Sequence, residues 1–363
     1  MIKKILYISP DFNYSCGRSK LVFLYLEYFG NREGYETHFI TNGGDSLERL
    51  NEIPTLKFQK LAFSSGIKNI FYQRGFYKTL KDYIIKNGIN LIHTHHRFPE
   101  FVSNRIAKEL NLKTLTSAHS FVTGFKKISF KSDKIISVSN SVTSYLVKNF
   151  NVNKKKIITL YNPVEEFPVL KPQEKEKLKR EMGIKPDQKV LLFMGRINYI
   201  KGFDKLIEAY KIVHRKDGNA ILIMCGKAED KSFFELRTRL TVPIIIIPPL
   251  KDNKKLYQIA QIVVLPSRVE TFSFVMIEAG SNKKPFIGGN TGGIAEFIED
   301  GVDGLLVDPE NENELAEKIL FLLNNKETAE EFGNNLYKKV KEKCGYNNYF
   351  SRLEEIYNSL LNA

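Results

Sequence analysis

The sequence predicts an α/β protein with two doubly wound domains, each a parallel sheet covered by helices on both faces. The length of 363 residues suggests two domains, at about 150 residues per domain. Short apolar segments of strand length alternate with helical patterns, as expected for parallel sheets. The alternation stops once, at a charged, proline-containing stretch over 165–188, and then restarts. We expect this stretch to be a linker with one short helix.

The first half of the chain contains apolar segments typical of buried strands, with helical patterns between them. The expected strands are 3–9, 36–42, 90–96, 113–119, 134–140 and 156–162. The expected helices are 19–33, 66–88, 99–111 and 141–151. Parallel strands of this kind are buried on both faces. We therefore expect the first half of the chain to form one complete sheet with helices packed on both of its faces.

The second half repeats this pattern after the linker. The expected strands are 189–195, 220–226, 243–249, 261–267, 284–289 and 304–309. Helices are expected at 203–216, at 272–282 beginning near Thr271, and through most of the tail 311–363, where acidic residues begin the helices and lysines follow. The predicted boundaries are an N-terminal domain at 1–165, a C-terminal domain at 166–345 and a final helix at 346–363.

Composition places the chain among soluble globular proteins. Hydrophobic residues make up 42% and charged residues 26%, which excludes global disorder. No apolar run approaches the roughly 20 residues of a membrane-spanning helix, and the apolar segment at the N-terminus is too short for a signal peptide. Cys16, Cys225 and Cys344 are too far apart for a disulfide framework or a metal set. We therefore expect a cytoplasmic protein.

The positive charge is unevenly distributed. The chain has 55 basic and 41 acidic residues, a net charge of +14, and all of this excess lies within residues 1–160. A general enrichment in lysine would raise the positive charge of both halves, so it does not explain the asymmetry. A basic half is typical of a surface that faces nucleic acid, a phosphorylated acceptor or an anionic lipid.

Ligands of such sheets bind beyond the carboxyl ends of the strands, so we look there for chemistry. Arg196 and Lys201 lie on a glycine-bounded loop that leads into a helix, an arrangement that suits a diphosphate. The alternative is a solvated loop with incidental basic residues. Gly17 lies just before the helix that follows the first strand, but no G-x-G-x-x-G motif accompanies it, which argues against a nicotinamide cofactor.

Two carboxylates follow a strand of the second half. Glu270 lies in the loop before the helix, and Glu278 lies within it, between apolar residues. Carboxylates accept hydrogen bonds from sugar and ribose hydroxyls, so the pair suits a nucleotide-sugar. The alternative is a helix with an acidic start and one interior glutamate. A carboxylate in so apolar a segment needs a partner in either case.

Four of the six histidines lie in or just after two strands of the first half: His93, His95, His96 and His119. Strand alternation puts His93 and His95 on one face and His96 on the other, and no cysteine or acidic set accompanies them. We therefore expect no metal site. His119 ends its strand and is expected to point toward a ligand.

Taken together, these segments resemble the retaining glycosyltransferases of family 4, which have the GT-B fold of two Rossmann-like domains facing a cleft. The specific segments are GRINYIKG (195–202), PSRVETFSFVMIEAG (266–280) and TGGIAEFIEDGVDGLLV (291–307). The resemblance covers essentially the whole chain. It implies an N-terminal acceptor domain, a C-terminal nucleotide-sugar domain and a last helix that packs back on the N-terminal domain.

The resemblance implies roles for five side chains. Arg196 and Lys201 would hold the donor diphosphate and neutralise the charge that develops on the leaving nucleotide. Glu278 would accept hydrogen bonds from the donor ribose. Glu270 would lie beside the transferred sugar, and His119 would lie near the reacting centre.

The resemblance also implies backbone contacts to the donor. The N–H groups of Phe272, Ser273 and Phe274 would line the sugar and phosphate, and the Gly17 loop would cover them. Cys16 stands where the family usually has a first glycine, which leaves the identity of the sugar open.

The family mechanism implies transfer with retention, no metal and no other cofactor. Attack is expected on the front face, with the leaving phosphate helping to deprotonate the acceptor hydroxyl. Glu270 as a covalent nucleophile is the alternative. A UDP-sugar donor is favoured over a GDP-sugar, with a hexose as the transferred group.

The resemblance and the basic first half together suggest a glycolipid or polyprenyl-linked saccharide as acceptor, in the synthesis of bacterial surface polysaccharide or lipopolysaccharide. We expect peripheral association with the inner face of the cell membrane, and Arg18 near an anionic acceptor. The segment 66–88 carries basic residues among aromatics that suit an anionic lipid surface: Lys68, Arg74, Lys78 and Lys81. The alternative is a helix whose apolar face packs on the sheet.

Other functions fit the sequence less well. A GT-B epimerase would need carboxylates placed for acid–base catalysis on the sugar. The E-x7-E spacing of Glu270 and Glu278 does not favour this. An inactive scaffold subunit would not be expected to retain its charged donor residues. A nucleic-acid binder would use the basic half, but no recognised binding motif supports it, and we expect no nucleic-acid partner.

Overall fold

The structure is a computed structural model that describes residues 2–63, 69–238, 240–250 and 254–362. The chain forms two compact units. Unit 1 comprises Met1–Asn162 together with Asn347–Ala363, and unit 2 comprises Pro163–Tyr346. Each unit holds one parallel sheet with helices packed against it, which confirms the predicted α/β class.

Unit 1 contains a seven-stranded parallel sheet in the order β3-β2-β1-β4-β5-β6-β7. Its strands are β1 (Lys3–Ile8), β2 (Tyr35–Thr41), β3 (Lys57–Lys60), β4 (Leu91–Thr94), β5 (Lys113–Ala118), β6 (Lys134–Ser137) and β7 (Ile157–Thr159). The central strands are buried on both faces, as is typical of parallel sheets. The sequence did not predict β3, because its residues are mostly exposed at the sheet edge and carry no strand pattern. The strand order reverses between β1 and β4, so ligands are expected at that point.

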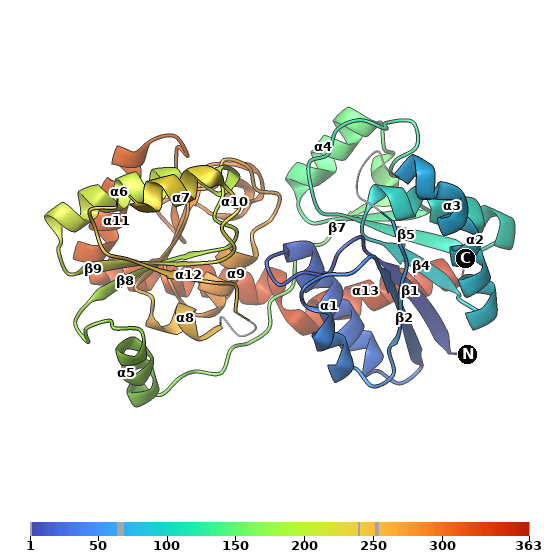
Figure 1. Ribbon diagram of the computed structural model, residues 1–363, viewed down its shortest axis with the longest axis horizontal. Helices are drawn as coiled ribbons and strands as arrows, with labels where there is room; N and C mark the ends of the chain where they lie inside the picture. The colour runs from blue at the N-terminus through green and yellow to red at the C-terminus, as the bar shows by residue number, and fades with distance from the viewer. Residues whose placement is uncertain (1, 64–68, 239, 251–253, 363) are drawn as a thin grey trace. The chain divides into compact units, whose positions relative to one another are not determined.

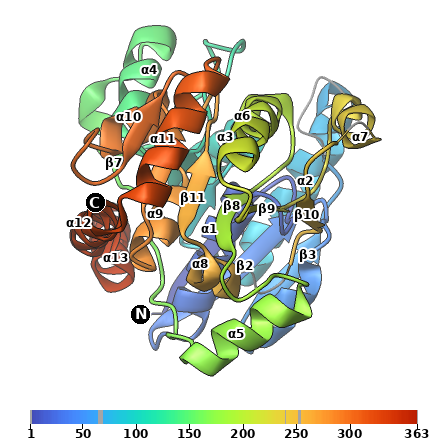
Figure 2. The same cartoon turned by 90° about the vertical axis from the view of Figure 1, so that its left-hand side faces the viewer.

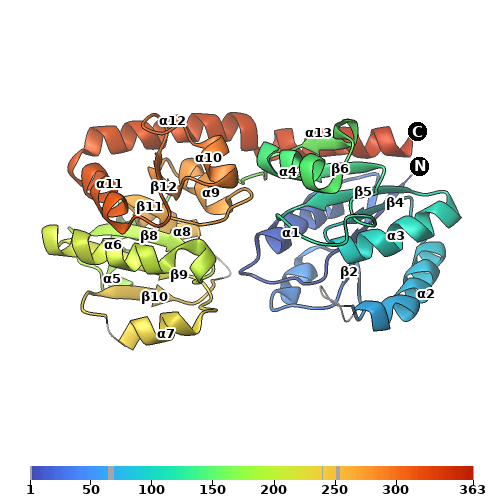
Figure 3. The ribbon, with the colours of Figure 1, turned by 90° about the horizontal axis from the view of Figure 1, so that it is seen from above.

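Helices cover both faces of this sheet (Figures 1 and 3). They are α1 (Gly17–Gly30), η1 (Leu47–Glu52), α2 (Asn69–Asn87), α3 (Arg97–Leu110), α4 (Asn140–Phe150), η2 (Lys154–Lys156) and α13 (Tyr346–Leu361). Helices α2 and α3 pack in a core cluster with Leu6 and Ile92. Helix α13 meets the other face, where the Tyr357 hydroxyl donates to Tyr7 of β1 at 3.1 Å. The last helix therefore packs on the N-terminal unit, as expected.

Unit 2 contains a six-stranded parallel sheet in the order β10-β9-β8-β11-β12-β13. Its strands are β8 (Lys189–Met194), β9 (Ala220–Cys225), β10 (Ile244–Ile247), β11 (Ile262–Leu265), β12 (Phe286–Gly289) and β13 (Leu305–Val307). Figure 2 shows β11, β8, β9 and β10 side by side in this order. The order reverses between β8 and β11. The loops after these two strands are the ones that carry the predicted donor residues.

The helices of unit 2 lie on both faces of its sheet; in Figure 1, α6 and α7 lie on one face and α8 on the other. The helices are α5 (Pro172–Glu181), η3 (Tyr199–Lys201), α6 (Phe203–Lys216), α7 (Lys231–Thr238), α8 (Lys254–Ile259), α9 (Phe274–Ser281), α10 (Gly292–Phe297), α11 (Glu312–Asn324) and α12 (Lys326–Cys344). The short linker helix was predicted and is α5. No helix in the described part of the chain is both long and apolar enough to cross a bilayer.

One predicted boundary was wrong. The helix that carries Glu278 begins at Phe274 and not near Thr271. Ser273 ends the preceding loop, because its side-chain oxygen accepts a hydrogen bond from the Met276 amide at 3.2 Å. Serine is favoured at this capping position, where it satisfies an amide that the helix leaves unpaired.

Candidate functional site

The loop after β8 is held tightly against the end of β11. Gly202 has a φ of 72°, and a Cβ at this position would lie 2.1 Å from the carbonyl oxygen of Pro266. Glycine is therefore required here for both its conformation and its lack of a side chain. Asn198 begins the short turn η3 by accepting a hydrogen bond from the Lys201 amide at 3.1 Å. This turn fixes the position of Lys201.

The structure brings together two residues that the sequence singled out separately. The Lys201 Nζ atom lies 2.5 Å from Glu270 Oε2, and their side chains are 17% and 10% exposed. Lysine carries three donors, so the ion pair leaves others for a ligand. The pair places a cation and a carboxylate side by side at the point where the strand order of unit 2 reverses.

Arg196 lies on the same loop and is more accessible than Lys201. Its side chain is 44% exposed, and Nη1 lies 3.4 Å from Glu229 Oε2. Asn198 Nδ2 donates to the same carboxylate oxygen at 2.9 Å. A guanidinium held this loosely can turn toward an anionic ligand. Sequence reasoning missed Glu229, which follows β9 and carries no local signal.

Arg268 connects the loops after β8 and β11, and sequence reasoning missed it as well. Its guanidinium donates to both oxygens of Asp204, at 2.7 and 2.8 Å, and also to Glu310. The guanidinium carbon lies 3.7 Å from the centre of the Tyr199 ring, and the Arg268 amide donates to the Ile200 carbonyl at 2.8 Å. Arg268 is therefore a positioning residue for the loop that carries Lys201.

Glu278 has the partner that its apolar surroundings require. The carboxylate is 3% exposed and accepts a hydrogen bond from the hydroxyl of Tyr257 on α8. Burial, and then the neighbouring Glu278, hold the pKa of Tyr257 well above its usual value. The tyrosine therefore stays protonated as a donor. The sequence indicated that a partner was needed but could not identify it.

The residues whose backbone is predicted to contact the donor, Phe272, Ser273 and Phe274, lie where two further loops meet. Phe272 is buried and packs edge-on against Phe297, with ring centres 5.4 Å apart. The Gly293 amide donates to the Glu270 carbonyl at 2.9 Å. A Cβ on Gly293 would lie 2.1 Å from the Thr271 carbonyl oxygen. The chain around Phe272, Ser273 and the partly exposed Phe274 is thus packed against the start of α10.

Unit 1 has its own cluster of predicted residues, after β1. Helix α1 begins at Gly17, and the preceding Cys16 offers no side-chain hydrogen bond to cap it. Arg18 Nη2 lies 2.6 Å from Asp11 Oδ2, and the arginine side chain is 18% exposed. Arg18, predicted to face an anionic acceptor, is therefore oriented by Asp11.

Three histidines of unit 1, His93, His95 and His119, form a polar row in which His93 and His95 are buried. His93 is bonded to the Tyr357 hydroxyl through Nδ1 and to the Ser117 hydroxyl through Nε2, both at 2.8 Å. Its ring lies over that of His95, with centres 4.4 Å apart. His95 Nδ1 in turn lies 3.0 Å from His119 Nε2. His119 is thus held by a row of side chains that reaches back to helix α13.

Burial keeps these histidines neutral. Burial first, and then Arg18, lower the pKa of His119 to about 3. The same two causes lower the pKa of His96, which caps α3, to about 4. His119 is therefore a neutral hydrogen-bonding group near pH 7. Within the described residues, no group of three or more His, Cys, Asp or Glu side chains could hold a metal ion.

The histidine row predicts acid sensitivity of folding. Unfolded histidines titrate near pH 6.5, whereas the buried ones have lowered pKa values, so unfolding takes up protons below that pH. The free energy of unfolding should therefore fall between pH 7 and 5, by up to about 1.4 kcal/mol per pH unit for each histidine. Urea denaturation of the wild type and of a His93→Gln/His95→Gln variant measures this. An equally steep pH dependence in the variant would contradict the assignment.

Helix α2 carries the predicted lipid-facing residues, and its apolar face packs in the core. Phe76 and Leu80 are buried in a cluster with β1, β4 and α3. Lys81 forms an ion pair with Glu109 at 2.8 Å, while Arg74 and Lys78 are exposed. Lys68 lies outside the described residues. The structure thus supports the packing interpretation of the apolar face and leaves Arg74 and Lys78 at the surface.

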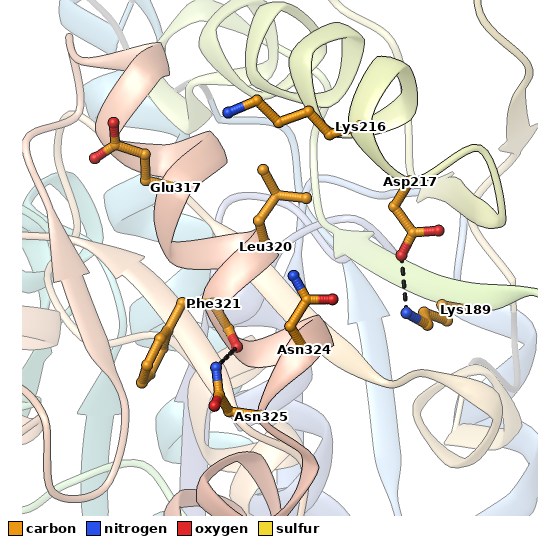
Figure 4. Close-up of a pocket in the computed structure, with 8 residues that line it drawn as sticks. All are labelled: Lys189, Lys216, Asp217, Glu317, Leu320, Phe321, Asn324 and Asn325. Atoms are coloured by element: carbon orange, nitrogen blue, oxygen red, sulfur yellow. Dashed lines mark hydrogen bonds and ion pairs between the residues drawn. The ribbon is translucent and has the colours of Figure 1, made fainter.

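A polar hollow of about 550 Å³ lies elsewhere on unit 2 (Figure 4). Lys189 begins β8 and is paired with Asp217 there at 2.8 Å. Ligands of doubly wound sheets bind beyond the carboxyl ends of the strands, whereas this hollow lies at the amino end of β8. It is therefore separate from the candidate site. Its lining is formed by Lys189, Lys216, Asp217, Glu317, Leu320, Phe321, Asn324 and Asn325.

Two family models match the chain in tandem. Residues 26–166 match Glycosyltransferase Family 4, and residues 174–339 match Glycosyl transferases group 1. The chain is also 30% identical over 375 residues to the uncharacterized glycosyltransferase MJ1178 of Methanocaldococcus jannaschii, with 99% of each chain covered. The chain belongs to glycosyltransferase family 4. This family 4 glycosyltransferase has the GT-B fold of two Rossmann-like domains.

Two more comparisons show proteins that are similar to this family 4 glycosyltransferase. It is 25% identical over 354 residues to the capsular polysaccharide biosynthesis glycosyltransferase CapM of Staphylococcus aureus, with 92% of each chain covered. The crystal structure of Anabaena Alr3699/HepE in complex with UDP-glucose has a TM-score of 0.84 and 16% identity, covering 98% of this chain and 99% of that one. The structural likeness shows a shared fold.

Proposed function

We propose that this enzyme transfers a hexose from a UDP-sugar, with retention of configuration, to a hydroxyl of a glycolipid or polyprenyl-linked saccharide. The observation that carries the proposal is the Lys201–Glu270 pair at the reversal point of the unit 2 sheet, with Arg196 on the loop that carries Lys201. The UDP-glucose complex of the structurally similar HepE supports a UDP-sugar donor. The relation to CapM supports a role in bacterial surface polysaccharide synthesis, with lipopolysaccharide as a related product class.

The residues of unit 2 suit a nucleoside diphosphate as the leaving group. Lys201 and Arg196 supply positive charge where the diphosphate develops negative charge, so the reaction needs no metal ion or other cofactor. Glu278, held by Tyr257, accepts hydrogen bonds from the ribose hydroxyls. Glu270, oriented by Lys201, accepts hydrogen bonds from the sugar. The leaving phosphate oxygen takes the proton of the acceptor hydroxyl on the same face.

The residues of unit 1 suit the acceptor. His119 is neutral and offers hydrogen bonds near the reacting centre without adding a charge. Arg18, beside Asp11, faces an anionic group of the acceptor. The positive charge of residues 1–160 favours the inner face of an anionic membrane, where such acceptors reside, and exposed Arg74 and Lys78 add to it.

Thermal unfolding with UDP, GDP, CDP and ADP, in EDTA, tests the donor site. A nucleotide at 100-fold its Kd should stabilise the fold by about 2.7 kcal/mol, and we expect UDP alone to do so. The shift should vanish in an Arg196→Ala/Lys201→Ala variant. A response to GDP instead would indicate that the donor is a GDP-sugar. No response to any nucleotide would contradict the proposal and favour the scaffold alternative.

The ribose contact makes a separate prediction. Glu278→Gln should raise the Kd for UDP by about 10-fold, because hydrogen bonds to a charged group contribute about 1.5–3 kcal/mol and the amide keeps part of that strength. Calorimetric titration of UDP measures this. The control is Glu208→Gln, at a partly exposed glutamate on α6 that is paired only with its neighbour Lys211 in the described structure. An unchanged Kd for Glu278→Gln would remove Glu278 from the site.

A further inference from the structure

The chain between β5 and β6 exposes apolar side chains among lysines. This segment crosses from one strand to the next without a helix. Phe125 is 62% exposed and Ile128 is 40% exposed, with the exposed Lys126 and Lys127 between them. Exposed apolar groups that occur together, and not singly, mark a surface that contacts another partner. We call 121–128 the crossover loop.

The base of the crossover loop is anchored by polar contacts on one side. Arg97 Nη1 donates to the carbonyl oxygens of Thr123 and Gly124, at 2.8 and 2.9 Å. The Tyr145 hydroxyl of α4 donates to the Val122 carbonyl at 2.7 Å. These contacts hold the backbone that leads to the exposed residues.

The chain after the crossover loop is anchored as well. The Ser129 hydroxyl donates back to the Phe125 carbonyl at 3.0 Å. The buried carboxylate of Glu100 accepts the amides of Phe130 and Lys131, at 2.8 and 2.6 Å. Phe125 itself has a φ of 51°, a region that residues with side chains rarely adopt. The exposure of Phe125 and Ile128 is therefore built into the fold.

The charge around the crossover loop indicates which partner fits. Lys126 and Lys127 lie within the crossover loop and Lys131 follows it, and residues 119–131 contain no acidic residue. Aromatic and aliphatic tips flanked by lysines match an anionic bilayer, where apolar groups enter the headgroup layer and lysines meet phosphates.

We propose that the crossover loop is the membrane-contacting element of unit 1, inserting Phe125 and Ile128 into an anionic lipid surface. This inference rests on the proposed function, because it supplies the surface for a lipid-linked acceptor. Phe125 follows His119 by six residues, a span of at most roughly 20 Å in extended chain. A bilayer that meets the loop therefore brings its headgroups within reach of the end of β5.

Vesicle sedimentation tests this inference with the full-length protein. The probes are vesicles of phosphatidylcholine with 30% phosphatidylglycerol, and vesicles of pure phosphatidylcholine, at low and high salt. We expect the wild type to bind the anionic vesicles at low salt and to bind the neutral ones weakly. Phe125→Ser/Ile128→Ser should lower the vesicle affinity at least tenfold. Lys126→Glu/Lys127→Glu should lower it similarly and reduce its salt dependence.

Matched controls separate this loop from other surfaces. Arg74→Glu/Lys78→Glu makes the same charge change on α2 and should change affinity by only a few-fold. Val169→Ser removes an apolar side chain that is 82% exposed in unit 2 and should have no effect. Loss of binding in the α2 variant but not in the loop variants would overturn the inference, as would strong binding to neutral vesicles.

The UDP shift in thermal unfolding distinguishes the two proposals. Loop variants that keep both the wild-type Tm and the UDP shift are folded, so their loss of vesicle binding supports the inference. A wild type that shows the UDP shift but ignores anionic vesicles overturns the inference and leaves the donor proposal standing. A wild type that binds vesicles through the loop but shows no nucleotide shift supports the membrane-contacting role of the loop and overturns the proposed activity.

Discussion

Replacing Lys201 with alanine should lower kcat for sugar transfer by about 10²–10³-fold, as expected for the loss of one group that stabilises developing charge. The ammonium is the cation best placed for this role, because Glu270 and the turn capped by Asn198 fix its position. Lys201→Arg should retain more activity, since it keeps the charge. The measurement is the rate of transfer from the donor that the nucleotide screen identifies.

The control for Lys201 is another lysine of unit 2 that is paired with a glutamate. Lys205 lies 2.8 Å from Glu312, with side chains 26% and 33% exposed. Lys205→Ala should leave transfer close to wild type, because this pair lies on the surface of α6 and α11. A Lys201→Ala variant with wild-type kcat and an unchanged UDP shift would remove Lys201 from the mechanism. The Lys201→Ala variant also leaves the carboxylate of Glu270 unpaired, so its Tm should be recorded beside its activity.

Replacing Gly293 with alanine should impair both stability and transfer. The added Cβ would lie 2.1 Å from the Thr271 carbonyl oxygen, so the loops that carry Glu270 and begin α10 must move apart. Overpacking of this kind costs about 1–3 kcal/mol of unfolding free energy. A displacement of about 1 Å at a reacting site can lower the rate by about 10²-fold. Urea denaturation and transfer kinetics measure the two effects.

Gly218→Ala is the matched control for Gly293→Ala. The nearest atom to a Cβ at Gly218 lies 4.0 Å away, and the residue is exposed in the same unit. It should leave both the free energy of unfolding and kcat near wild type. If Gly293→Ala behaved the same way, the close contact between these loops would not matter for the site.

Much of the fold could be predicted from local pattern. Buried strands such as β8 and β11 are runs of apolar residues, and the loop after β8 contains the glycines that a tight turn needs. The charged linker and its helix α5 were visible for the same reason. Edge strand β3 was not, because an exposed strand has no apolar pattern to detect. The start of α9 was misplaced because the capping role of Ser273 depends on the conformation of its own loop.

The candidate site could be predicted only as separate residues. The motif segments indicated Arg196, Lys201, Glu270 and Glu278, but no pattern indicated which of them meet. Asn198 offered a signal, since asparagine before a short helix is a common cap. Arg268 and its partner Asp204 offered none, because they are 64 positions apart and neither stands out within its own segment.

The sequence by itself determined most of the strands and helices, the division into two sheets and the residue types that follow the strands, because periodicity and turn chemistry act over a few neighbouring residues. The tertiary structure decided the partners and the environments. It paired Lys201 with Glu270 and Tyr257 with Glu278, lowered the pKa of His119 by burial, and left Phe125 exposed. These properties depend on which distant segments pack together, and burial and electrostatic pairing arise only after the chain has folded.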